Sequence, residues 1–309
     1  MISVIIATLN RAEALRSVSL PSLLRQDRAD FETIVWDASE GGESKRVCDE
    51  LSPLFEKKGA PLRYFKAPRA GSSSQRNDAV REAAGGIVYF IDDDTEISID
   101  TISALRSCFA SFPWLMGASP PLLNKNPAAG NSFIKNLAVV LFGAKNMRFK
   151  RIISGSGALS LPVKDMAGSA DWLSGCTMAL RKSIFGALSF DERLERFGGY
   201  AIGEDVELSH KVALEYKQPL MVAHGGYAIH HSAPAGNRSA GWRKVAAAFY
   251  NHALIRKEFE RYGRKFRLPA RIWGHIGSVL SLLCTGTPPR DIIKGIREAR
   301  KALRETTKQ

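Results

Sequence analysis

The stretch GIVYFIDDDTE, residues 86–96, decides the fold. An apolar run typical of a β-strand ends abruptly in three consecutive acids, Asp92, Asp93 and Asp94. Like charges at a strand tip repel one another, so folding alone does not favour this cluster. A divalent cation resolves the repulsion, because Mg²⁺ and Mn²⁺ prefer carboxylate oxygen and often also hold substrate phosphates. The stretch therefore predicts a metal and diphosphate site at the carboxyl end of a strand in an α/β sheet, where such sheets bind ligands.

Length and composition bound the class of protein. With 309 residues and 45% hydrophobic content, the chain suits one large α/β domain with an appendage, or two modest domains. Its longest apolar stretches, residues 137–143 and 276–284, fall far short of the ~20 residues that cross a bilayer. The chain opens directly in a strand-like run without signal-peptide features. Four scattered cysteines are typical of free thiols in a reducing cytosol, so we expect a cytoplasmic protein.

Apolar runs alternate with helical patterns through the first 119 residues. We expect a kink at Pro21 in the first helix and an N-cap at Asn10. Connections this short predict a Rossmann-like, mostly parallel sheet with helices on both faces. The expected strands are residues 2–7, 32–37, 62–66, 87–91 and 115–119, and the expected helices are residues 11–26, 43–57, 72–84 and 97–112.

The regular alternation breaks after residue 121. Residues 124–160 are rich in Gly, Asn, Ser and basic residues around an apolar segment, which predicts an inserted lid or acceptor loop. Regular structure resumes near residue 171, and the later patterns predict a helix at residues 205–216, a strand at 220–223 and helices from 239 onward.

Polar residues follow the first two expected strands. Asp37 ends the second strand, where it could accept a hydrogen bond from a nucleobase N–H or serve as a helix cap. Thr8, Asn10 and Arg11 follow the first strand at the same edge of the sheet. Arg11 could bind a phosphate or pair with an acid. We expect these residues to bind the donor half of a substrate.

A helix start and the acid cluster complete the expected donor side. Arg76 and Asn77 enter the helix at residues 72–84, where they could cradle a diphosphate or ribose, although Asn77 could simply cap the helix. Asp94 is the expected direct metal ligand, and Asp92 is expected to contact ribose, metal-bound water or the metal. Asp93 is expected either to contact the donor or to point away from the metal site.

Five motifs in this order resemble glycosyltransferase family 2, the inverting transferases of GT-A fold. They are SVIIATLNR, the strand ending in Asp37, SQRNDAVREAAGGIVYFIDDDTE, DWLSGCTMALRKSIF and GEDVELSHK, and the likeness covers about residues 1–231. The transferases that build bacterial surface polysaccharides are the most similar kind. The resemblance implies a GT-A catalytic domain at residues 1–235, an acceptor loop at 124–160 and a basic, amphipathic helical region at 236–309.

The resemblance also implies an acceptor side. Glu204 and Asp205 open a helix, where acids ordinarily stabilise the helix dipole. In the family, an acid of this motif takes the proton from the acceptor hydroxyl, and we assign Asp205 as base and Glu204 as its orienting partner. Trp172 could stack on a sugar or pack in the core, and Gly175 belongs to the same motif. His230 and His231 follow the last expected strand, and in some GT-A enzymes a histidine there completes the metal shell. His231 is the expected ligand, although such a pair is often only structural.

These expectations add up to one reaction. The chain is expected to use Mn²⁺ or Mg²⁺ to move a sugar from a UDP- or dTDP-type sugar to a hydroxyl of a glycan or lipid-linked acceptor. A pyrophosphorylase needs a glycine-rich loop after the first strand, and residues 8–11 hold no glycine. A phosphohydrolase of the haloacid-dehalogenase kind needs threonine where Glu96 stands. A nucleotide- or RNA-binding module is the remaining alternative, but no RNA-binding motif is recognisable and we expect no nucleic-acid partner.

The C-terminal residues carry most of the net charge of +13. From residue 261 onward, twelve Lys and Arg stand against three acids, which indicates an anionic partner. Residues 268–283 form an apolar helical face, and the next helix aligns its basic residues in one stripe. This pattern is typical of helices in a membrane interface, so we expect a peripheral protein on the inner membrane face. Packing on the catalytic domain is the alternative. The apolar face comprises Leu268, Ile272, Trp273, Ile276, Val279, Leu280 and Leu283, and Arg267 and Arg271 lie near its start.

Overall fold

The computed structural model describes residues 1–123, 151, 153, 165–198, 201–231, 240–266, 268–284 and 286–306. The expected insertion at residues 124–160 therefore lies almost wholly outside the described residues. Among the described helices, none is both long and apolar enough to cross a bilayer.

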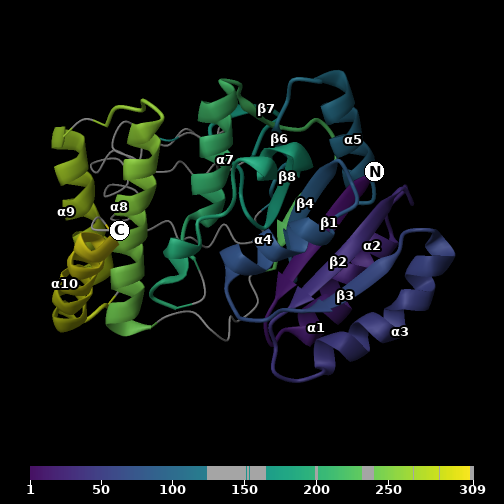
Figure 1. Cartoon of the computed structure of the whole chain (residues 1–309), viewed down its shortest axis with the longest axis horizontal. Coiled ribbons are helices and arrows are strands. Elements are labelled where there is room, and N and C mark those ends of the chain that lie inside the picture. Colours follow the sequence, from purple (N-terminus) through teal and green to yellow (C-terminus); the bar gives the residue numbers. More distant parts are fainter. Residues whose placement is uncertain are drawn as a thin grey trace.

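An eight-stranded sheet forms the centre of the molecule, with strand order β3-β2-β1-β4-β8-β6-β9-β7 (Figure 1). The first four of these strands in sequence pair in parallel, and β8 enters antiparallel between β4 and β6. Four of the seven strand pairs in this sheet are parallel, so the mostly parallel sheet is confirmed. The strands are β1 (Ile2–Thr8), β2 (Phe31–Asp37), β3 (Leu62–Lys66), β4 (Ile87–Asp92), β6 (Gly117–Ser119), β7 (Gly168–Ala170), β8 (Thr177–Arg181) and β9 (Leu220–Val222).

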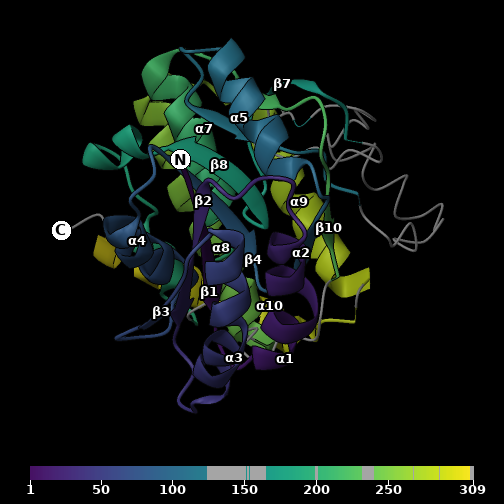
Figure 2. The ribbon, with the colours of Figure 1, turned by 90° about the vertical axis from the view of Figure 1, so that its right-hand side faces the viewer.

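Helices cover both faces of the sheet (Figure 2). Side chains of a strand alternate between its two faces, and β1 shows the result. Ile2, Val4 and Ile6 pack with α2, α3 and α5, whereas Ile5 packs with α4 and α7. The helices are α1 (Ala12–Ala14), α2 (Leu20–Leu24), α3 (Glu43–Lys58), α4 (Ser72–Glu82), α5 (Thr101–Ser111) and α7 (Glu204–Tyr216), and two 3₁₀ turns span Lys182–Gly186 and Glu192–Glu195.

Two expected helices differ from the structure. The helix expected at residues 11–26 is interrupted by a π-helical segment, Leu15–Ser19, and Pro21 lies in the first turn of α2, where proline is tolerated. Arg11 rather than Asn10 is the N-cap of α1, because Asn10 adopts a positive φ of 55°. The helix expected from residue 97 begins at Thr101, since the preceding residues form β5 (Thr95–Ile97), which pairs with β10 (Ala228–His230).

Three helices stand together at the end of the molecule remote from β2 and β3 (Figure 1). They are α8 (Gly241–Arg261), α9 (Leu268–Cys284) and α10 (Pro289–Thr306). Asn251 of α8 donates to the backbone oxygens of Leu194 and Ile202, both at 3.0 Å, and so ties α8 to the segment that precedes α7. Gly295 lets α10 approach α8 closely, because a Cβ there would lie 2.6 Å from the Cβ of Val245. The division into domains at residue 235 stays a prediction.

Candidate metal and transfer site

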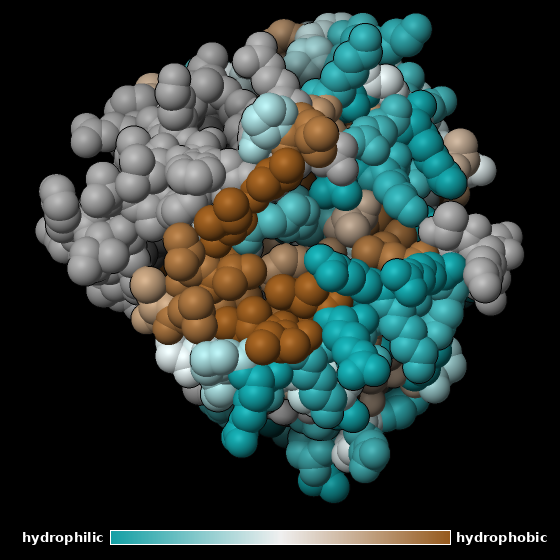
Figure 3. All heavy atoms as spheres, turned by 90° about the vertical axis from the view of Figure 1, so that its left-hand side faces the viewer, coloured by the Kyte–Doolittle hydropathy of each residue, from teal (hydrophilic) through white to brown (hydrophobic). Residues whose placement is uncertain are grey.

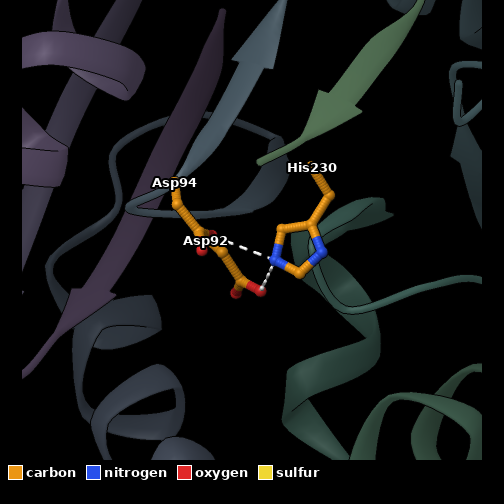
Figure 4. A group of neighbouring side chains, drawn as sticks. All are labelled: Asp92, Asp94 and His230. Atoms are coloured by element: carbon orange, nitrogen blue, oxygen red, sulfur yellow. Dashed lines mark ion pairs between the residues drawn. The ribbon is translucent and has the colours of Figure 1, made fainter. Parts of the chain in front are cut away.

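Two acids and one histidine converge at the carboxyl end of β4. Asp92 is the last residue of β4, and Asp94 follows one residue later in the turn before β5. Because β10 pairs antiparallel with β5, His230 lies opposite Thr95 and beside these acids (Figure 4). His230 Nε2 lies 3.0 Å from Asp94 Oδ1 and 3.7 Å from Asp92 Oδ2. One ligand atom from each of the three residues lies within 4.8 Å of the others.

The charges of this group suit a divalent cation. Burial would raise the pKa of Asp94, but His230 and Arg11 outweigh that effect and hold it well below its usual range. Burial likewise opposes the charged form of His230, yet Asp94 and Asp92 raise the pKa of its imidazole. Two carboxylates and one imidazole are ligands that Mn²⁺ accepts, and three protein ligands leave positions for substrate oxygens. The residues therefore fit the expected metal.

Asp93 faces away from this group. Its Oδ2 accepts a hydrogen bond of 2.7 Å from Thr8 Oγ1, and its Oδ1 lies 3.2 Å from Arg11 Nη1. Burial raises the pKa of Asp93 to about 7, although Arg11 and Thr8 oppose the shift. Arg11 also pairs with Asp94. The structure thus shows Arg11 paired with acids, one of the two roles that its sequence position allowed.

Arg76 links the metal group to the acids of α7. Its Nη2 lies 3.0 Å from Asp92 Oδ1, and its Nη1 lies 2.7 Å from Glu204 Oε1. Only 8% of the Arg76 side chain and 7% of the Glu204 side chain are exposed. Burial and the charge of Asp205 raise the pKa of Glu204 to about 7 despite this contact. The two acid motifs therefore form one electrostatic unit.

Asp205 is held by backbone groups. Its Oδ2 accepts from the N–H of Gly175 at 2.7 Å, and its Oδ1 accepts from the N–H of Val206 at 2.8 Å. Burial raises the pKa of Asp205, and the two N–H groups oppose that shift. A Cβ on Gly175 would lie 3.0 Å from the Cβ of Asp205, so glycine permits the close approach. The turn reaches this edge because β8 runs antiparallel and pairs its first residue, Thr177, with Ile91 at the end of β4.

Asp37 ends β2 at the same sheet edge, opposite Thr8 in the β1–β2 ladder. Its Oδ1 accepts from the N–H of Ser39 at 2.9 Å and from the Ser39 hydroxyl, and its Oδ2 accepts from Tyr64 Oη at 3.0 Å. The N–H of Asn10 donates to Ser39 Oγ at 2.7 Å. Asp37 therefore stabilises a turn between β2 and α3 and does not cap a helix.

Three expected site residues make other contacts. Asn77 donates to the backbone oxygen of Phe190 at 3.0 Å and accepts from the N–H of the same residue at 2.9 Å. Trp172 is 4% exposed and packs with Val206 and other apolar residues, which is the core-packing alternative that its sequence position allowed. His231 Nε2 lies 3.0 Å from Glu96 Oε2 and does not join the metal group.

Sequence reasoning missed two residues of this region. Successive side chains of a strand point to opposite faces, so only one of His230 and His231 can face the acids, and the pair itself does not indicate which. Gln75 donates to the backbone oxygens of Thr8 at 3.0 Å and Trp36 at 2.9 Å, and so clamps the ends of β1 and β2. The sequence signal that could have identified Gln75 is its position next to Arg76 in the first turns of α4.

Known proteins show similarity to this chain at two levels. Residues 3–109 match the family model described as glycosyl transferase family 2. The GalNAc(5)-diNAcBac-PP-undecaprenol beta-1,3-glucosyltransferase of Campylobacter jejuni is 31% identical over 106 residues, which cover 34% of this chain and 33% of that protein. The match thus spans about a third of the relative's length.

Two solved structures share the fold. A crystal structure of GalNAc-T7 with UDP, GalNAc and Mn²⁺ superposes with a TM-score of 0.59 at 13% identity, over 93% of this chain and 58% of that one. A mannosyltransferase from Pyrobaculum calidifontis in complex with GDP-Man and Mn²⁺ gives a TM-score of 0.51 at 18% identity, over 98% and 86% of the two chains. The expected GT-A fold is confirmed. The match to glycosyl transferase family 2 runs from β1 through the Asp92–Asp94 turn into α5, so about the first third of this chain is similar to that family.

Proposed function

We propose that this chain is a metal-dependent, inverting glycosyltransferase. It moves one sugar from a nucleotide-diphosphate sugar, of UDP or dTDP type, to a hydroxyl of a glycan or lipid-linked acceptor. One observation supports the proposal most strongly. At one edge of the sheet, Arg76 contacts both Asp92 of the Asp92–Asp94–His230 group and Glu204 of the Glu204–Asp205 motif. Two structural neighbours support it, one in complex with UDP and Mn²⁺ and the other with GDP-Man and Mn²⁺.

Asp94, Asp92 and His230 are the proposed ligands of Mn²⁺ or Mg²⁺, and His230 replaces His231 in this role. Such a cation, when bound, neutralises the charge that develops on the departing diphosphate. Arg11 and Arg76 already pair with Asp94 and Asp92, so they hold these carboxylates in place before the donor arrives.

Asp37 is the proposed contact to the nucleobase. It is buried, yet its carboxylate retains lone pairs beyond the bonds to Ser39 and Tyr64, and these can accept a base N–H. Thr8 and Asn10 position the loop that follows β1 through Asp93 and Ser39. Asn77 and Trp172 stabilise the structure around the site in this proposal, because Asn77 is hydrogen-bonded within the protein and Trp172 is buried.

Asp205 is the proposed base. The acceptor hydroxyl gives its proton to the Asp205 carboxylate, and its oxygen forms a bond to the anomeric carbon from the face opposite the diphosphate. The bond from that carbon to the diphosphate oxygen breaks, its electron pair leaves with the nucleoside diphosphate, and the configuration inverts. Burial raises the pKa of Asp205, which makes its carboxylate a stronger base than one in water. Glu204, fixed by Arg76, orients the acceptor.

A lipid-linked acceptor is the proposed finer identity of the substrate. The Campylobacter jejuni relative is named for a glycan linked to undecaprenol through a diphosphate. Undecaprenol is a lipid, so such a glycan is held at a membrane. A transferase that uses such an acceptor works at the inner membrane face, which is the site of action that we propose for this chain.

The test is release of nucleoside diphosphate from a panel of nucleotide sugars with Mn²⁺. Asp94→Ala should remove metal-dependent donor binding, and Asp205→Asn should retain binding and lose turnover. Asp49→Asn is the matched control, because Asp49 is an exposed acid on α3 that pairs only with Lys45 in the described residues. Formation of nucleoside triphosphate from pyrophosphate would instead show a pyrophosphorylase. No release and no metal-dependent binding with any donor would contradict the proposal.

A further inference from the structure

An apolar stripe lies exposed along α9. It consists of Leu268, Ile272, Ile276, Leu280 and Leu283, which recur at steps of four and three and are between 42% and 61% exposed. Figure 3 shows a continuous apolar band on the face of the molecule where α9 and α10 lie. Beside the stripe, the ring of His275 stacks on Phe249 of α8, with the ring centroids 5.8 Å apart. An apolar surface of this length on an otherwise charged protein marks a binding face.

A basic surface on α10 flanks the stripe. Helix α10 packs on α8 through Ile292, Gly295, Ala299 and Ala302, which are buried. Its other side exposes six cations: Arg290, Lys294, Arg297, Arg300, Lys301 and Arg304. Four of these line a hollow of about 610 Å³ together with Ile293, Ile296 and Glu305. The close approach at Gly295 fixes the rotation of α10 against α8. Of the six cations, Lys294 contacts α8, because its Nζ lies 4.5 Å from the ring centroid of Trp242.

We propose that α9 and α10 form a docking face for an anionic lipid bilayer. Helix α9, 17 residues and about 25 Å long, lies along the bilayer surface with its stripe among the acyl chains. The cations of α10 then contact lipid phosphates, and the hollow between them accepts a head group. This inference concerns a surface outside the transfer site and does not depend on the proposed reaction.

Charge favours a bilayer over a second copy of this chain. A symmetric dimer that pairs the two α9 stripes antiparallel would bring the two cationic α10 helices side by side. Their repulsion opposes that pairing, whereas anionic head groups complement the cations. Each cation near such a surface strengthens binding about fivefold, so removing three should weaken it about a hundredfold.

Vesicle co-sedimentation of the full chain tests the inference. The probes are vesicles of phosphatidylcholine alone and of phosphatidylcholine with phosphatidylglycerol. One variant replaces the stripe, Ile272→Gln, Ile276→Gln and Leu280→Gln, and a second replaces cations, Arg297→Gln, Lys301→Gln and Arg304→Gln. The matched control removes three exposed cations near the other end of the molecule, Arg28→Gln, Arg46→Gln and Lys57→Gln. Thermal unfolding verifies that every variant folds.

The wild-type chain and the control should bind the anionic vesicles alike, and more weakly at high salt. The cation variant should bind about a hundredfold more weakly, and the stripe variant should lose binding. Three results would overturn the inference: no binding by the wild-type chain, equal loss in the control and cation variants, or a wild-type dimer that the stripe variant breaks while vesicle binding stays unchanged.

Discussion

Replacing Arg76 with methionine removes the cation that joins two acids of the site. Arg76 and Glu204 are both more than nine-tenths buried and lie 2.7 Å apart, so the change leaves a buried carboxylate without its partner. Breaking such a pair costs about 3–5 kcal/mol of unfolding free energy. The contact to Asp92, whose side chain is 31% exposed, adds about 1 kcal/mol or less. Above pH 7, where Glu204 of the wild-type protein is ionised, the expected total is therefore about 3–6 kcal/mol.

The unfolding free energy that Arg76→Met loses should increase with pH. The pKa of Glu204 is about 7 in the folded protein, above its unfolded value, so stability falls as pH rises through the window between the two. Without Arg76 the pKa of Glu204 rises further. Below pH 7 Glu204 is protonated in both proteins, so its titration does not change the difference in stability between them. Above pH 7 only the variant keeps the proton, so the difference in stability between the two proteins widens as pH rises above about 7.

Urea denaturation followed by tryptophan fluorescence measures both effects. Arg25→Met is the matched control, because Arg25 pairs with Glu96 at 3.1 Å while the two side chains are 56% and 34% exposed. We expect the control to lose about 1 kcal/mol or less, with no widening at high pH. Equal losses for the two variants, or a gap for Arg76→Met that ignores pH, would refute the reasoning about buried charge.

Two further predictions follow from the histidines. His230→Ala should weaken Mn²⁺ binding by at least about tenfold, while His231→Ala should leave it unchanged, as titration calorimetry can measure; equal effects would remove His230 from the metal group. Burial lowers the pKa of His210 to about 4, and its neutral ring donates from Nδ1 to the Asp171 oxygen and accepts from Arg264 at Nε2. Stability should therefore be lost as pH falls from about 6.5 to about 4, by up to about 3 kcal/mol. His210→Gln should flatten that slope in urea titrations, and an unchanged slope would assign the loss to other groups.

The parallel half of the sheet was predictable because local patterns determine it. Apolar runs and helical periods over residues 1–112 gave β1 to β4 and most of the helices between them, including the strand ends that carry Asp37 and Asp92. Strands of three residues, such as β5, β7 and β10, are too short to show a period. The place of β8 between β4 and β6 depends on long-range pairing that no local pattern records.

Long-range packing explains the contacts of Asn77 and Trp172 that sequence reasoning did not foresee. Asn77 contacts Phe190, 113 residues away, and this partner could not be read from the start of α4. Trp172 is buried by residues of α7 and α8, which no motif joins to it. The acids, by contrast, were predictable because the carboxyl ends of neighbouring parallel strands meet at one edge.

The site depends on contacts between residues that lie far apart in the sequence, so it forms late in folding. Arg76 and Glu204 lie 128 residues apart in sequence, and Thr8 and Asp93 lie 85 apart, so the site is built from late, long-range contacts. During synthesis, on the order of ten seconds pass between emergence of the first and last of these residues. The N-terminal strands can pair in that interval, but His230 and Glu204 are still missing. Metal binding thus reports that the chain has folded through α7 and β10, and a nascent chain lacking them holds its acid cluster without a complete site.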